Sequence, residues 1–110
     1  MGETADAKSF VELFLTCRDQ AEAEKIAQSL LEQHLVACVK FESVRSRYWW
    51  QGKLEVSDEL ELSMLSTSGN FVRIEAELTK LHSYNTFVLH ATPVVRLNEA
   101  AVTWLAENTK

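Results

Sequence analysis

Two cysteines and one histidine are the side chains in this sequence best suited to metal or redox chemistry. Cys17 ends the apolar run that begins at Phe10, Cys38 opens a second such run, and His82 ends a helical pattern. Sulfur and imidazole nitrogen are ligands that suit copper and zinc. Their spacing does not match a CxxC motif, and free cysteines are often buried as small apolar residues. A soft-metal or redox site and simple packing are therefore competing interpretations.

The positions of these residues bear on the interpretation as a soft-metal or redox site. Cys17 lies where a strand passes into a helix, and a thiol near a helix N-terminus can have a lowered pKa. His82 lies beside Ser83 and Tyr84 in a segment that leads from a helix into a strand. Loops carry binding residues more often than regular elements do. A metal or ligand site at His82 and Tyr84 and an ordinary loop without a site are therefore the two interpretations of this segment.

Three consecutive aromatic residues, Tyr48, Trp49 and Trp50, precede the turn signal Gln51-Gly52. Each aromatic side chain buries roughly 150–250 Å² when it is covered. So much apolar surface at a turn predicts a contact between subunits, and a hairpin folded back onto its own rings is the alternative. Lys53, together with Arg45 and Arg47 on the same hairpin, is a candidate to face an anion there.

Periodicity predicts one α+β domain with the order β-α-β-β-α-β and a terminal helix, the ferredoxin-like arrangement. Asp19 is expected to cap the first helix, with Glu22 three residues on. Alternation in the third strand places Glu59 and Glu61 on a solvated face. The expected elements are strand 10–16, helix 19–34, strands 36–50 and 53–65, helix 68–81, strand 87–95 and a short helix after Asn98.

Three details complete the expected fold. The strand at 10–16 is almost wholly apolar, so we expect it to be central and buried on both faces. Pro93 cannot donate a hydrogen bond, so its strand should lie at an edge or contain a bulge. Trp104 and Leu105 are expected to point inward from the last helix. We assign residues 9–110 to the single domain and residues 1–8 to a disordered segment.

Composition narrows the classes of function. The 110 residues carry 11 basic and 16 acidic side chains, a net charge of −5, and the cations are scattered, so nucleic-acid binding is not expected. No apolar run approaches membrane-spanning length, and the acidic first six residues do not resemble a signal peptide. These features predict a cytoplasmic protein that does not bind membranes. Common hydrolase, kinase and nucleotide-binding motifs are absent, so we do not expect an enzyme.

The sequence resembles the CutA family of divalent-cation-tolerance proteins over nearly its whole length. The similar segments are Phe14-Leu15-Thr16-Cys17, Ala23-Glu24-Lys25-Ile26-Ala27, Leu35-Val36-Ala37-Cys38-Val39, the hairpin tip with Tyr48, Trp50, Gly52 and Lys53, the loop with His82 and Tyr84, Pro93-Val94, and Trp104-Leu105. The resemblance implies a ferredoxin-like homotrimer with paired hairpins, intersubunit clefts like those of PII signalling proteins, and an association with copper or another divalent cation. Cys17 and His82 match the family's proposed metal-binding positions.

The sequence departs from the family pattern around that loop. Ser83 and Phe87 replace prolines, and Asn85 and Val88 replace acids. Gln51 replaces an acid at the hairpin tip, and Ser66 replaces a lysine at the end of the third strand. Loss of carboxylates removes hard oxygen ligands. The leading hypothesis is a divergent CutA-like trimer involved in divalent metal binding or tolerance. The alternative is a PII-like signalling or scaffold trimer that binds a small anion, nucleotide or partner protein in its clefts.

Overall fold

The computed structural model describes residues 9–110 of the chain, and the segment 1–8 that was predicted to be disordered lies outside the described residues. The predicted element order is confirmed. Within the described part, none of the helices has the length and apolar character needed to span a bilayer. The elements are β1 (Phe10–Cys17), α2 (Gln20–Glu32), β2 (Cys38–Trp50), β3 (Lys53–Thr67), a 3₁₀ turn (Ser68–Asn70), α3 (Phe71–Leu81), β4 (Leu89–Pro93) and α4 (Glu99–Asn108).

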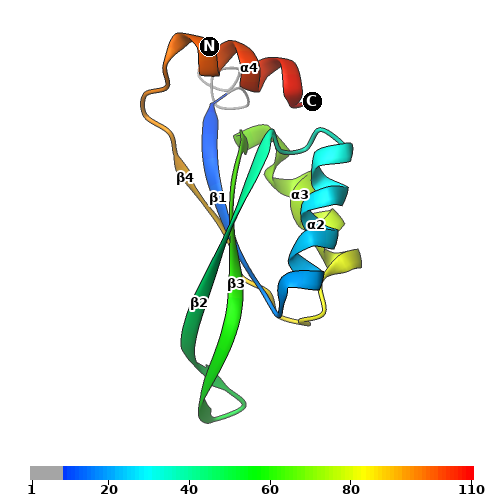
Figure 1. The fold of residues 1–110 in the computed structure, drawn as a ribbon, viewed down its shortest axis with the longest axis vertical. Helices are drawn as coiled ribbons and strands as arrows, with labels where there is room; N and C mark the ends of the chain where they lie inside the picture. Colours follow the sequence, from blue (N-terminus) through cyan, green and yellow to red (C-terminus); the bar gives the residue numbers. More distant parts are fainter. Residues whose placement is uncertain (1–8) are drawn as a thin grey trace.

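The four strands form one antiparallel sheet in the order β2-β3-β1-β4. Helices α2 and α3 lie side by side on one face of this sheet, and α4 crosses one end of it (Figure 1). This is the predicted ferredoxin-like α+β arrangement. Its topology brings the end of β1, the start of α2 and the loop between α3 and β4 together at the end of the sheet opposite α4 (Figure 1).

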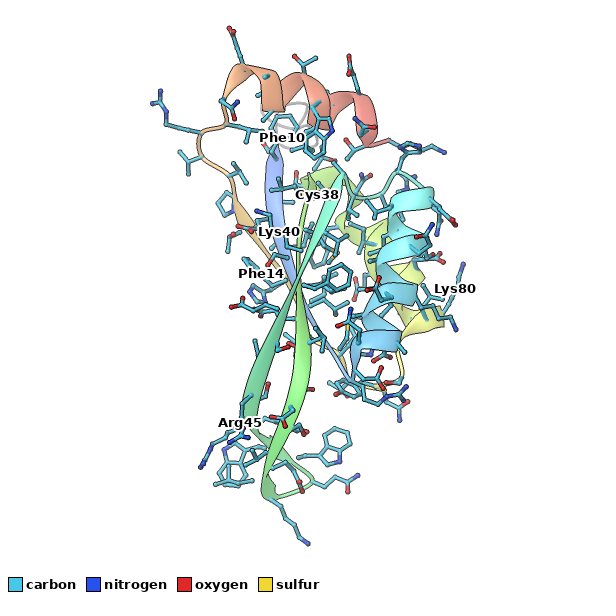
Figure 2. The ribbon with its side chains drawn as sticks, in the orientation of Figure 1. Phe10, Phe14, Cys38, Lys40, Arg45 and Lys80 are labelled. Carbon is cyan, nitrogen blue, oxygen red and sulfur yellow. The ribbon has the colours of Figure 1, made fainter. Side chains whose placement is uncertain are left out.

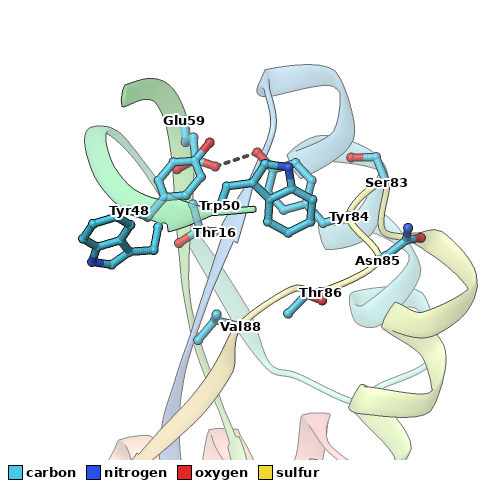
Figure 3. A pocket seen from close by; sticks show the side chains of 10 residues that line it. Thr16, Tyr48, Trp50, Glu59, Ser83, Tyr84, Asn85, Thr86 and Val88 are labelled. Atoms are coloured by element: carbon cyan, nitrogen blue, oxygen red, sulfur yellow. Dashed lines mark hydrogen bonds between the residues drawn. The ribbon is translucent and has the colours of Figure 1, made fainter. Parts of the chain in front are cut away.

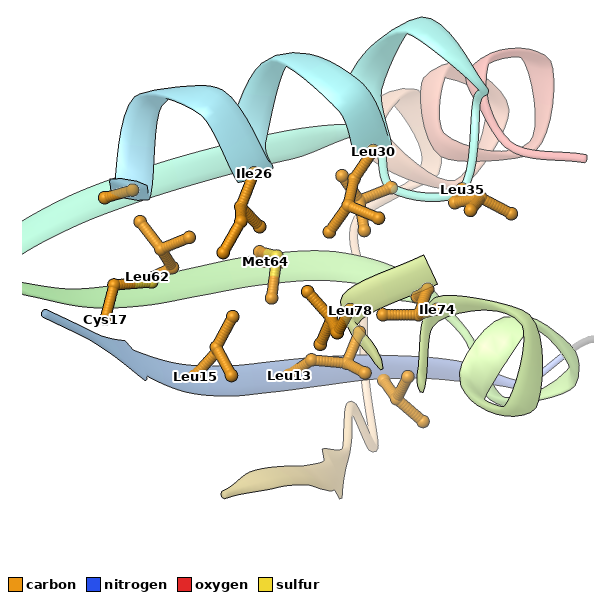
Figure 4. Packing of buried hydrophobic residues seen from close by; sticks show 13 residues of the cluster. Leu13, Leu15, Cys17, Ile26, Leu30, Leu35, Leu62, Met64, Ile74 and Leu78 are labelled. Atoms are coloured by element: carbon orange, nitrogen blue, oxygen red, sulfur yellow. The ribbon is translucent and has the colours of Figure 1, made fainter. Parts of the chain in front are cut away.

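The core lies between the sheet and the two helices. Alternate residues of β1 face it, and Leu13, Leu15 and Cys17 are almost completely buried there. Burial of a leucine side chain stabilises a fold by about 1.5–3 kcal/mol. Figure 4 shows how they meet side chains of the other core elements. These include Ile26 and Leu30 of α2, Leu62 and Met64 of β3, and Ile74 and Leu78 of α3.

The prediction that β1 is buried on both faces is wrong. The other face of the strand is only half-buried, and Phe14 on that face stacks on the exposed ring of His90, with 5.1 Å between ring centroids. Helices cover one face of the sheet only, so an apolar residue on the far face is covered by its neighbours alone. A run of apolar residues does not distinguish these two cases.

The β2–β3 hairpin extends well beyond the rest of the sheet. Pairing of β1 with β3 ends at Cys17 and Leu60, so residues 53–59 of β3 pair with β2 alone. The projecting arm gives the chain its long axis, 46 Å against 26 and 25 Å (Figure 1). At the tip, Gln51 and Gly52 have φ of 50° and 79°, as a two-residue turn between twisted strands requires. The predicted turn is therefore confirmed.

Two expectations near the C-terminus need correction. The predicted strand 87–95 is shorter, since only Leu89–Pro93 pairs with β1, although Pro93 does end an edge strand as expected. Leu105 is fully buried, but Trp104 is 41% exposed. Neighbouring residues of a helix point about 100° apart, and in α4 only Leu105 faces the core.

Candidate functional site

The junction between β1 and α2 is built around the buried side chain of Glu22. Asp19 caps the helix as predicted, because its Oδ1 accepts a hydrogen bond of 2.9 Å from the backbone N–H of Glu22. The Glu22 carboxylate turns inward and is buried. Its Oε1 accepts from the N–H of Arg18 at 2.8 Å, and its Oε2 accepts from the N–H of Ser83 at 2.5 Å.

Two opposing influences act on the Glu22 carboxyl. Burial is the largest influence and disfavours the charged form, but the hydrogen bonds from the N–H groups of Arg18 and Ser83 favour it. Together the favourable influences prevail, and the pKa of Glu22 lies below its ordinary value. The carboxylate thereby joins the start of α2 to the loop that follows α3.

His82 holds the same loop against β1 from within. Its side chain has no exposed surface, and it packs against the rings of Tyr84 and Phe87 at centroid distances of 4.9 and 5.2 Å. Nδ1 accepts from the backbone N–H of Tyr84 at 3.1 Å, which places the proton on Nε2; this nitrogen donates to the carbonyl of Thr16 at 2.9 Å. Both ring nitrogens are therefore engaged.

The thiol of Cys17 does not behave as its place before a helix predicted. Cys17 is completely buried, and burial raises the pKa of its thiol to about 12, with further contributions from the charges of Glu22 and Glu59. The lowered pKa that a helix N-terminus can give is therefore not found, and the packing interpretation holds for Cys17. Desolvation and two nearby carboxylates outweigh the partial positive charge of the helix N-terminus.

Cys38 lies at the opposite end of the sheet. It pairs with Leu65, whereas Cys17 pairs with Leu60, so the two cysteines are about 16 Å apart along the strands. Figure 2 shows Cys38 at the same end as Phe10, away from the hairpin tip. The structure thus brings Cys17 and His82 to one end of the sheet and leaves Cys38 at the other.

The three predicted donors do not fit a bound metal ion as they stand. Within residues 9–110 no group of three or more His, Cys, Asp or Glu side chains is arranged to hold an ion. Cys17 is held as a thiol by its raised pKa, and His82 has no free ring nitrogen. An ion could reach this pair only after the loop had rearranged.

A pocket of about 500 Å³ lies where the hairpin faces the loop after α3 (Figure 3). At its edge the Tyr84 hydroxyl donates a hydrogen bond of 2.5 Å to the Glu59 carboxylate (Figure 3). Burial, and then Glu59, raise the pKa of Tyr84 above its ordinary value, so its hydroxyl remains a donor at neutral pH. The residues that line the pocket are Thr16, Tyr48, Trp49, Trp50, Glu59, Ser83, Tyr84, Asn85, Thr86 and Val88.

The pocket gathers most of the predicted interface residues. Tyr48, Trp49, Trp50 and Tyr84 all line it, while Lys53 is exposed at the tip and does not. The aromatic side chains remain partly open to solvent, with Trp49 72% exposed. The hairpin is thus not folded back far enough to cover its own rings.

Glu59 is the residue of this pocket that sequence reasoning placed wrongly. It was expected on a solvated face, yet it is only 6% exposed. It does alternate with Leu60 as predicted, but it lies just beyond the last residue of β3 that pairs with β1. The loop carrying Tyr84 fills that space and covers the carboxylate. The sequence signal for this burial is the end of β1 at Cys17, because residues of β3 beyond Leu60 have no neighbour in β1 and leave space for a loop.

The sequence matches one known protein family over most of its length. Residues 11–108 match the model of the CutA1 divalent ion tolerance protein family. The chain belongs to the CutA1 family. The resemblance noted in the sequence is thereby confirmed, and the match spans almost all of the described residues.

Individual relatives agree with the family match. The divalent-cation tolerance protein CutA of Archaeoglobus fulgidus is 33% identical over 98 residues, 89% of this chain and 96% of that protein. The CutA of Pectobacterium atrosepticum is 35% identical over 86% of this chain and 87% of its own. The solved structure of the A. fulgidus protein, described there as periplasmic, superposes with a TM-score of 0.89 at 32% identity, covering 92% of this chain and 99% of that one. The Cut A1 structure from Thermus thermophilus gives 0.88 at 30% identity, covering 92% and 99%.

The burial and raised pKa of Cys17 predict an unreactive thiol. In a Cys38→Ser variant, labelling by Ellman's reagent at pH 8 should be at least about 100-fold slower in the native protein than in guanidinium chloride, because the thiolate is scarce and inaccessible. The Cys17→Ser variant, which keeps the half-buried Cys38, is the control. Rapid labelling of native Cys17 would contradict the described burial.

The hydrogen bonds of Glu22 predict a dependence of stability on pH. Because its folded pKa lies below the ordinary 4.5, the ionised group stabilises the fold above pH 4.5, and this contribution disappears as the pH falls through the lowered pKa. Glu22→Gln should therefore lower the free energy of unfolding by about 1–3 kcal/mol at pH 7, and the difference from wild type should shrink in acid.

Urea titrations from pH 7 to pH 3 measure this difference. Glu24→Gln, on the exposed face of the same helix, is the matched control and should change stability by less than about 0.5 kcal/mol. A Glu22→Gln deficit that stays constant down to pH 3 would show that the charge of Glu22 is not responsible.

Proposed function

We propose that this protein contributes to cellular tolerance of divalent cations, copper among them, and that it does so without catalysing a reaction. The observation that carries the proposal is the family match over residues 11–108. The sequence also lacks the motifs of common enzyme classes. Cys17 and His82, at one end of the sheet, are the donor pair that we propose for copper, once a rearrangement of the loop has exposed the thiol and released a ring nitrogen of His82; Cys38 is not part of that pair.

The proposal that a small anion or nucleotide is the ligand receives no comparable support. Among the described residues, no lysine or arginine lines the pocket. Arg45 is paired with Asp58 at 3.3 Å on the exposed hairpin. Divalent-cation tolerance is therefore the function retained.

The cytoplasm is the compartment that we propose. Cys17 and Cys38 are both free thiols, and unpaired cysteines are common where glutathione keeps the environment reducing. The description of the A. fulgidus relative as periplasmic applies to that protein.

We further propose that the chain assembles as a homotrimer through its hairpins. The arm beyond Leu60 pairs with no other strand of the described chain, and β2 is an open edge along its whole length. Leu54 and Val56 on this arm are 67% and 53% exposed. Open strand edges with apolar side chains are favourable surfaces for pairing between chains.

Growth under copper stress tests the function. In a bacterial host that lacks its own CutA1 family member, expression of this protein should raise the Cu²⁺ concentration that arrests growth. His82→Gln should reduce that gain, since it removes a proposed copper ligand while retaining an amide donor for the Thr16 carbonyl. His90→Gln, which alters an exposed histidine, should retain it.

Calorimetric titration of the purified proteins with Cu(II) and Cu(I) measures copper affinity independently of the growth assay. We expect wild type and His90→Gln to bind copper at least about tenfold more tightly than His82→Gln, because imidazole is a stronger copper ligand than an amide. Equal weak binding by all three proteins would exclude a copper site at His82. Absence of any growth advantage would contradict the tolerance function itself.

Light scattering tests the assembly. At micromolar concentration the measured mass should be three times the chain mass of 12.5 kDa. Leu54→Ser should weaken the assembly because it removes apolar surface from the arm, whereas Val72→Ser, an equally exposed position on α3, should not. A monodisperse species of 12.5 kDa would rule out the trimer.

A further inference from the structure

The pocket between the hairpin and the loop after α3 is an aromatic enclosure. Tyr48 and Trp50 approach it from the hairpin, and Tyr84 approaches from the loop (Figure 3). Trp49 also belongs to its lining. Its volume of about 500 Å³ lies in the range of small-molecule sites. The faces of tyrosine and tryptophan rings carry negative partial charge and attract cations.

One carboxylate belongs to this enclosure. Glu59 lines the pocket and is only 6% exposed, so water solvates it poorly. Its Oε2 accepts the hydrogen bond from Tyr84, and no lysine, arginine or histidine within residues 9–110 forms an ion pair with it. A buried carboxylate is favoured by a positive charge close by, and the described chain supplies only a neutral hydroxyl.

The chemistry of the lining decides among classes of ligand. An anion would be repelled by Glu59, and a neutral apolar molecule would displace water from the carboxylate without replacing it. A hard divalent ion takes six or more oxygen ligands, and among residues 9–110 Glu59 is the only carboxylate that lines the pocket. A cation whose charge is surrounded by carbon matches both the rings and the carboxylate.

From these observations we infer that the pocket binds a small organic cation, a quaternary or methylated ammonium group, next to Glu59 and against the faces of the hairpin aromatics. The carboxylate selects for charge, and the rings of Trp50 and Tyr48 accommodate the methyl groups. This inference goes beyond the tolerance function and does not rest on it, because Cys17 and His82 do not line the pocket.

Choline and its neutral isostere 3,3-dimethyl-1-butanol form the decisive pair of probes. They share shape and a hydroxyl group but differ in charge. The assembled protein is titrated with each probe, and binding is measured by calorimetry and by tryptophan fluorescence. Choline should bind at least about tenfold more tightly than the alcohol. Equal binding of the two probes would show that the pocket selects for apolar shape and not for charge, and would contradict the inference. Absence of choline binding up to about 50 mM would also overturn it, since that concentration is well above the dissociation constant expected of such a cage.

Matched variants test the residues. Glu59→Gln keeps the shape of the side chain and should weaken choline binding about tenfold, while leaving the alcohol unchanged. Glu42→Gln, at an exposed position of β2 outside the pocket, is the control for net charge and should bind as wild type does. Trp50→Leu should weaken choline binding, and Trp104→Leu, which alters a similarly exposed tryptophan of α4, should not.

Each result of these variants decides something different. Unaltered choline binding by Glu59→Gln, or equal losses in Glu59→Gln and Glu42→Gln, would contradict a role for Glu59. Loss of choline binding in both tryptophan variants would indicate a general change of the protein and would overturn the pocket assignment. Copper tolerance measured with Trp50→Leu should remain as in wild type, so failure of this inference leaves the proposed function intact, and the reverse also holds.

Discussion

The arrangement of the candidate site depends on one buried carboxylate. Glu22 accepts hydrogen bonds from backbone groups on two segments that are far apart in sequence, at Arg18 before α2 and at Ser83 after α3. A buried acceptor without these donors would cost several kcal/mol, so the two segments are fixed together. His82 adds a second attachment through the carbonyl of Thr16. The loop after α3 is therefore held tightly despite its irregular backbone.

The pocket follows from that attachment and from a difference in strand length. Because the loop is fixed beside β1, Tyr84 reaches the carboxylate of Glu59, which lies just beyond the end of the β1–β3 pairing. The hairpin continues past this point and brings Trp50 over the loop (Figure 3). Neither the loop nor the hairpin alone encloses a cavity. The site thus combines a rigid side with an arm supported only by its own pairing and turn.

Local sequence patterns were sufficient for the elements but not for the environment of the charged residues. Alternation in β3, the Asp19 cap and the Gln51-Gly52 turn each act within a few residues, so they could be predicted. The burial of Glu22 and Glu59 could not, because a loop more than 20 positions along the chain covers each of them. The raised pKa of Cys17 could not be predicted either, since burial sets it first and those two carboxylates add to it.

The unequal pairing of β3 has a consequence for the order in which the sheet forms. Two residues separate β2 from β3, so this pair can close on the timescale of isolated hairpins, about 1–10 μs. Phe10 pairs with Thr67, and that contact must close a chain segment containing a helix and the whole hairpin. Contacts between distant residues form slowly because they restrict more of the chain. The arm is therefore expected to precede the core, and the arrival of the first strand sets the folding rate.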